Sequence, residues 1–168
     1  MTETDILMER LYGADRVKAM QKQNELIKDE IGLLEDKLAL AKDTYLVEDE
    51  KVLNTSWGNL ANVNPDIANG LAAAGITKLE FDENGNIINY TDIMTFLQDK
   101  LVGMQERYNS LSVDEQESYM ENTLEPFQNW LESFTKAMGQ YEETRELITD
   151  TENEILKEWN EWYSNNLD

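Results

Sequence analysis

The acidic and amide residues around position 84 form the part of the sequence that most resembles a metal-binding site. Asp82, Asn84 and Asn86 offer oxygen ligands at alternate positions, as the start of an EF-hand calcium loop does. Such a loop also needs glycine at its sixth position and glutamate at its twelfth, and this chain has isoleucine in both places. Its glycine, Gly85, comes two residues too early. We therefore interpret Asn84-Gly85 as the tight turn of a β-hairpin.

The chain contains neither histidine nor cysteine. This excludes Ser-His-Asp and Cys-His catalysis, thiolate metal sites and disulfide bonds. A carboxylate, lysine or tyrosine mechanism is still chemically open, but no spacing singles out a pair among the 35 acidic residues. The glycines are too scattered to form a phosphate-binding loop. We expect no enzymatic activity, no catalytic residues, no cofactor and no bound metal.

The balance of charge restricts the partners. Thirty-five acidic and 14 basic residues give a formal net charge of −21. This charge disfavours binding to nucleic acid and to anionic membranes, and it leaves three readings open: basic partners, cations, or a charge that serves solubility alone. The N-terminal residues do not resemble a signal peptide, and no apolar run is long enough to span a membrane. We therefore expect a protein that is not secreted and has no transmembrane segment.

An apolar heptad pattern runs through the N-terminal third of the chain, where no proline interrupts it from Asp5 to Leu53. Steps of four and three residues define a coiled-coil seam, and Glu48 fills its one missing position. Leucine and valine at steps of seven widen this stripe at positions 26, 33, 40 and 47. The predicted seam consists of Ile27, Ile31, Leu34, Leu38, Ala41, Tyr45 and Val52.

A second seam with the same rhythm lies near the C-terminus. Residues 16–51 carry seven basic and nine acidic residues, whereas residues 141–168 carry two basic and nine acidic ones. Pairing the two helices would offset this difference, and the knob that joins them would make a pair within one chain antiparallel. The tryptophans near the end could instead form an interface with another subunit. The second predicted seam consists of Phe134, Met138, Tyr141, Ile148, Ile155, Trp159 and Trp162.

Between the two seams the pattern changes. A short helix is expected over 66–74, and Gly75 is well placed to end it. Residues 76–90 alternate around Asn84-Gly85 and predict the β-hairpin. Further helices are expected after Thr91 and after Ser112, which forms a capping box with Glu115.

Two segments resemble phage tail tape-measure proteins. The first is the run from Arg10 to Arg16 (RLYGADR), which leads directly into the heptad helix. The second is the run from Leu79 to Tyr90 (LEFDENGNIINY). In large members of that family a similar helix start is followed by a coiled coil, a small knob with such a hairpin and a returning helix. The resemblance implies a segment of a longer virion protein, and it carries over no catalytic residues.

The sequence thus predicts a mainly α protein, a long antiparallel coiled-coil hairpin with a distal knob of short helices and one β-hairpin. The predicted parts are a first helix over 1–56, a knob over 57–128 and a returning helix over 129–168. The resemblance favours a structural, non-catalytic virion segment that contacts neighbouring segments or itself. The alternative is an acidic interaction module, an adaptor or inhibitor, that binds a basic protein in the cytoplasm. Whether the seams pair within or between chains, as in a homo-oligomer, stays open.

Overall fold

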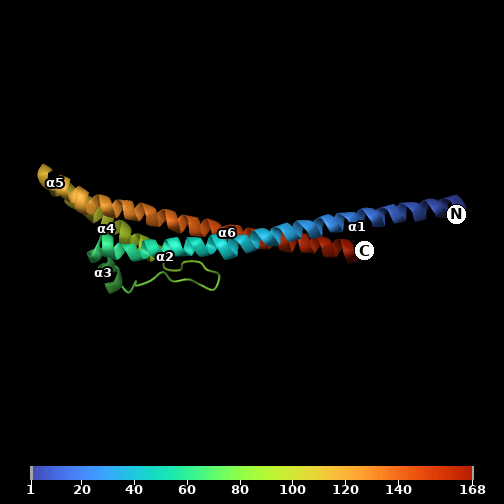
Figure 1. Ribbon diagram of the computed structural model, residues 1–168, viewed down its shortest axis with the longest axis horizontal. Helices are drawn as coiled ribbons and strands as arrows, with labels where there is room; N and C mark the ends of the chain where they lie inside the picture. Colours follow the sequence, from blue (N-terminus) through green and yellow to red (C-terminus); the bar gives the residue numbers. More distant parts are fainter. Residues whose placement is uncertain (1, 168) are drawn as a thin grey trace. The chain divides into compact units, whose positions relative to one another are not determined.

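The computed structural model describes residues 2–167, with the backbone alone given for residues 5, 8, 9 and 167. Helices make up 88 % of the structure, and no strand forms among the described residues (Figure 1). The predicted mainly α fold class is confirmed. The α-helices are α1 (Glu3–Leu40), α2 (Leu46–Val63), α3 (Pro65–Ala73), α4 (Tyr90–Ser110), α5 (Val113–Tyr119) and α6 (Glu125–Leu167). Two π-helical turns, η1 (Ala41–Tyr45) and η2 (Met120–Leu124), precede α2 and α6.

The sequence accounts for the ends of α2 and α3. Asn64 leaves the helical conformation and its side chain accepts a hydrogen bond from the backbone N–H of Ile67, at 3.1 Å. Pro65 follows at the first position of α3, where its missing N–H costs no hydrogen bond. Helix α3 ends before Gly75, whose φ of +86° suits a residue without a Cβ atom.

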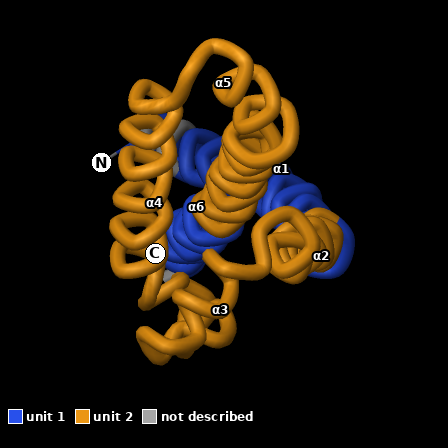
Figure 2. Tube along the Cα trace, turned by 90° about the vertical axis from the view of Figure 1, so that its left-hand side faces the viewer, with its two compact units in different colours: residues 1–44, 147–168 blue, residues 45–146 orange. Residues whose placement is uncertain are grey.

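The chain separates into two compact units, shown in different colours in Figure 2. Unit 1 contains α1, the residues of η1 up to Thr44 and the part of α6 from Leu147 onward. Unit 2 spans Tyr45–Glu146. Unit 2 therefore includes residues on both sides of the predicted knob over 57–128. Positions 1 and 168, which the outer predicted parts include, lie outside the described residues.

The two units differ in the size of their cores. Unit 1 buries a thin row of side chains between two helices, Ile27, Ile31, Ala41, Ile148 and Thr151. Unit 2 has a continuous core to which α2, α3, α4 and α6 all contribute. Within it Trp130 stacks on Phe134 with 5.0 Å between ring centroids, and Trp57 packs against the same phenylalanine at 5.9 Å.

The first predicted seam is wrong at Tyr45 and Val52, which are 44 % and 58 % exposed. The reason is η1, because a π-helical turn holds one residue more than an α-helical turn. The buried and half-buried positions match the predicted seam as far as Ala41. After Ala41, the matching buried or half-buried positions come one residue later in the sequence than the predicted seam positions. The side chains that line the interior after the turn are Leu46, Asp49, Leu53, Ser56 and Leu60.

The predicted β-hairpin over 76–90 forms only in part. Phe81 and Ile87 make one isolated antiparallel bridge, and no strand extends from it. The Asn89 side chain explains this, since its Oδ1 accepts from the N–H of Glu80 and its Nδ2 donates to the carbonyl of Lys78. These backbone groups would otherwise be available to a second strand. Helix α4 also begins at Tyr90, so the second arm of the hairpin is too short to form a strand.

Candidate functional site

The turn around Gly85 is held by hydrogen bonds that it makes with itself. Asp82 Oδ1 accepts from the backbone N–H groups of Asn84 and Asn86, at 2.8 and 2.9 Å, and Oδ2 accepts from Asn86 Nδ2 at 3.1 Å. These bonds, the one from the Asn86 backbone foremost, hold the pKa of Asp82 below its ordinary value. The carboxylate that the calcium comparison requires is therefore engaged in building the turn. Among residues 2–167 no group of three or more acidic side chains could hold a metal ion.

The same turn packs onto α6. The hydroxyl of Tyr141 donates to the carbonyl oxygen of Gly85, and its ring meets Phe81 edge to face at 5.8 Å. The guanidinium of Arg145 lies so close that a Cβ at position 85 would be 2.8 Å from its Cζ. Burial raises the pKa of Tyr141, and the nearby arginine opposes that shift. Gly85, predicted as a turn residue, therefore also allows the loop to approach α6 closely.

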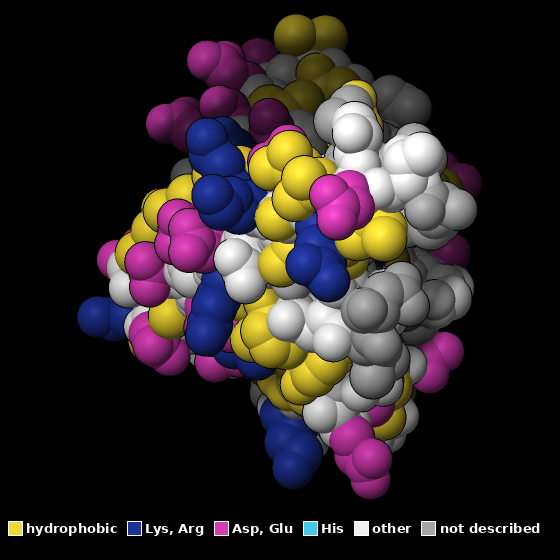
Figure 3. Space-filling model, turned by 90° about the vertical axis from the view of Figure 1, so that its right-hand side faces the viewer, with side chains coloured by type: hydrophobic (Ala, Val, Ile, Leu, Met, Phe, Trp, Pro, Cys, Tyr) yellow, Lys and Arg dark blue, Asp and Glu magenta, His cyan; other side chains and the backbone are white. Residues whose placement is uncertain are grey.

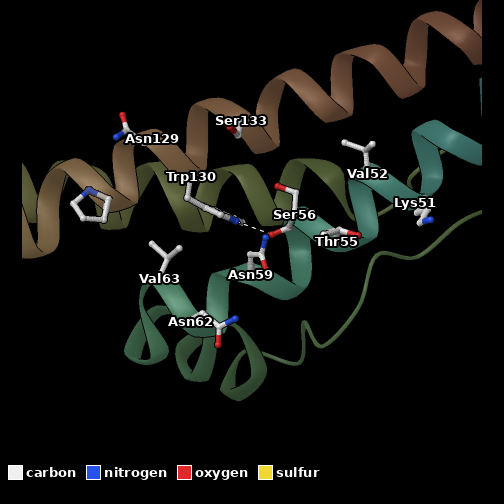
Figure 4. A pocket seen from close by; sticks show the side chains of 11 residues that line it. Lys51, Val52, Thr55, Ser56, Asn59, Asn62, Val63, Asn129, Trp130 and Ser133 are labelled. Atoms are coloured by element: carbon white, nitrogen blue, oxygen red, sulfur yellow. Dashed lines mark hydrogen bonds between the residues drawn. The ribbon is translucent and has the colours of Figure 1, made fainter.

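A groove lies between α2 and α6 in unit 2 (Figure 4). Its volume is about 620 Å³, and Trp130 forms part of its wall, with its indole N–H donating to the carbonyl oxygen of Ser56 at 2.7 Å. A second hollow of about 360 Å³ continues along the same helices and shares Val52, Ser56 and Ser133 with the first. We call these two hollows together the α2–α6 groove. Cationic side chains border it at Lys51 and Lys136.

An aromatic group occupies the C-terminal part of α6 in unit 1. Trp162 contacts Trp159 and Tyr163, with ring centroids 5.5 and 5.2 Å apart, and Lys28 Nζ lies 5.9 Å from the Trp162 ring centroid. Beside this group, Asn165 donates to the Asn24 side chain at 3.1 Å. Figure 3 shows hydrophobic side chains at the surface of the end that it views, between patches of both charges.

The structure brings most of the predicted seam residues to the interior but to different depths. The buried ones are Ile27, Ile31, Ala41, Phe134, Met138, Tyr141 and Ile148. The half-buried ones are Leu34, Leu38, Ile155, Trp159 and Trp162. Two buried threonines lie one residue before the predicted seam positions 145 and 152: Thr144 donates to Asp49, and Thr151 donates to the carbonyl of Leu147.

The sequence interpretation missed the inward-facing row of α2. Its members Leu46, Leu53 and Leu60 lie at steps of seven, so a signal was present, but the unbroken pattern before Ala41 concealed the change of phase. It also missed the α2–α6 groove, because a hollow between helices leaves no pattern in the sequence.

No family model, curated protein or solved structure matched this chain. No helix among the described residues combines the length and the apolar character that crossing a membrane requires.

Proposed function

We propose that this chain is a structural, non-catalytic helical segment whose N-terminal and C-terminal helices pair antiparallel within one molecule. The observation that carries the proposal is the direction of the contacts. In unit 1, Asn24 meets Asn165 while Lys42 meets Glu152, at 3.1 and 3.5 Å. As residue numbers rise along the first helix, they fall along the second.

Unit 2 supports the same pairing independently. Asp49 accepts from Thr144, and Ser56 further along α2 accepts from Trp130, earlier in α6. Both units thus have the register of an antiparallel pair, in which a buried stripe on each helix faces the other. The engaged Asp82 carboxylate and the thin apolar interior of unit 1 fit a scaffold role better than a reaction site.

The particular role that we propose is a segment of a phage tail tape-measure protein. It is supported by the resemblance of residues 10–16 and 79–90, and by their order along the chain. Mass spectrometry of purified virions should then find peptides of this chain with the tail proteins. Their absence from virions, with abundant chain in the infected cell, would contradict the assignment.

The antiparallel pairing can be tested by disulfide trapping, because the chain has no cysteine of its own. We expect the double variant Asn24→Cys with Asn165→Cys to oxidise within one chain and to run as a monomer on a non-reducing gel. A matched control is Leu26→Cys with Asn165→Cys, since two residues turn an α-helix by about 200°. Covalent dimers from the first pair, or equal crosslinking of both pairs, would overturn the pairing.

One observation favours the alternative, an acidic module that binds a basic protein. Glu158 lies among the carboxylates of Glu30, Glu154 and Glu161, and its pKa is raised by partial burial first and by these neighbours next. A cationic partner would relieve the repulsion. This alternative predicts salt-sensitive binding to a basic protein that weakens in the Glu158→Gln, Glu161→Gln double variant. Binding that is unaffected by that double change would count against it.

A further inference from the structure

Helix α1 carries a line of exposed leucines on a side that its own partner helix does not cover. Leu26, Leu33 and Leu40 lie at steps of seven residues and are 61 %, 71 % and 46 % exposed. Three residues after each comes an exposed aspartate, at positions 29, 36 and 43. Because side chains three residues apart are neighbours on a helix, these acids flank the leucines. We call the three leucines the apolar column.

The α2–α6 groove has complementary properties. Val52 and Trp130 give it apolar surface, and Val52 is 58 % exposed although it is a branched hydrocarbon side chain. Lys51 and Lys136 border the groove with positive charge in a chain of net charge −21. Its one acid, Asp49, is already engaged by the hydroxyl of Thr144.

The two surfaces also match in length. The apolar column runs from position 26 to position 40, and the lining of α2 runs from position 49 to position 63, so each covers 14 residue-to-residue steps. Each corresponds to about 21 Å of α-helix at ~1.5 Å per residue. A helix lying in a groove between two others is a common mode of recognition.

From these features we infer that the α2–α6 groove of one copy binds the apolar column of a second copy. Two columns packed antiparallel against each other would bring their aspartates together, whereas the groove offers lysines to the same aspartates. The contact joins two different surfaces, so every added copy still presents one free column and one free groove. Such heterologous contacts form open chains unless the rotation closes a ring. The inference does not depend on the virion assignment.

The test uses two matched variants of the full chain in sedimentation velocity over a concentration series. Leu33→Glu disrupts the apolar column, and Val52→Glu puts an acid into the groove, and both positions are exposed. We expect the unmodified chain to form species larger than dimers as its concentration rises, and each variant alone to stay monomeric. Circular dichroism should show unchanged helicity in both variants.

Mixing the two variants gives the decisive result. The intact groove of the Leu33→Glu copy can take the intact column of the Val52→Glu copy, and no further copy can then bind. We expect a 1:1 dimer that does not grow. Val113→Glu, at an 81 % exposed position of α5, is the control and should assemble like the unmodified chain. An unmodified chain that stays monomeric, or variants that fail to pair, would overturn the inference, and loss of assembly in Leu33→Glu alone would indicate a column-to-column dimer instead.

Discussion

At the scale of single residues, two glycines with the same backbone conformation differ in their surroundings. Gly75 and Gly85 have φ angles of +86° and +81°, but only Gly85 has atoms in the space where a Cβ would lie, and these belong to Arg145. Gly75→Ala should lower the free energy of unfolding by about 1 kcal/mol, the cost of a left-handed alanine. Gly85→Ala should lower it further, because the guanidinium must also move. Urea unfolding of both variants measures the difference, and equal losses would contradict the close contact.

Asp82 provides a pH-dependent prediction at the same scale. Its pKa lies below the ordinary value in the folded chain, chiefly through the N–H of Asn86. Its contribution to stability is therefore complete above the unfolded pKa and is lost as the pH falls below about 4. Asp82→Asn should be less stable than the parent at neutral pH, with a difference that shrinks on acidification. Glu83→Gln, an exposed change in the same turn, is the control, and a gap that widens in acid would contradict the prediction.

At the scale of elements, the π-helical turn η1 acts as a one-residue insertion into a regular heptad. Removing the exposed Thr44 should convert η1 into an α-helical turn. The buried side chains of α1 and those of α2 should then each stay in the interior of their own unit. We expect the free energy of unfolding to stay within about 1 kcal/mol of the parent. Removing Glu35, equally exposed but within α1, should rotate Ile27 and Ile31 away from the interior by about 100°. The loss should then be several kcal/mol, and thermal unfolding that ranks the two deletions the other way would contradict the account.

The same turn shows how far the sequence determined the structure. Apolar spacing was sufficient to predict most of the helical chain, and Gly75 was sufficient to predict the end of the short helix before it, since both rest on local preferences. It failed at Val52, because heptad counting assumes 3.5 residues per turn throughout and nothing local marks a π turn. The partial hairpin failed for a different reason: the Asn89 side chain competes for backbone partners at a distance of nine and eleven residues. The groove depends on which helices lie side by side, and spacing within one helix does not contain that information.

At the scale of the whole molecule, the units should differ in stability. Unit 1 buries a single row between two helices, whereas unit 2 has a core built from several. Since opening costs less where less apolar surface is buried, amides in α1 and in α6 beyond Leu147 should exchange faster than those in α2 and α4. Hydrogen exchange with mass spectrometry measures these amide exchange rates for each segment of the chain. Uniform exchange across both units would show instead that the chain opens as one cooperative body.

The tryptophans allow the unfolding of the two units to be followed separately by spectroscopy. Trp57 and Trp130 belong to unit 2, and Trp130 is 6 % exposed, stacked on a phenylalanine with 10° between the ring planes. Trp159 and Trp162 belong to unit 1, where their rings stand at 84° to each other with centroids 5.5 Å apart. Two indoles so placed couple their electronic transitions and give a paired circular dichroism band, which vanishes when they separate. The shielded indole of Trp130 fluoresces at shorter wavelength than one in water. The chain thus carries two built-in spectroscopic probes, and the order in which their signals disappear on heating reports which unit melts first.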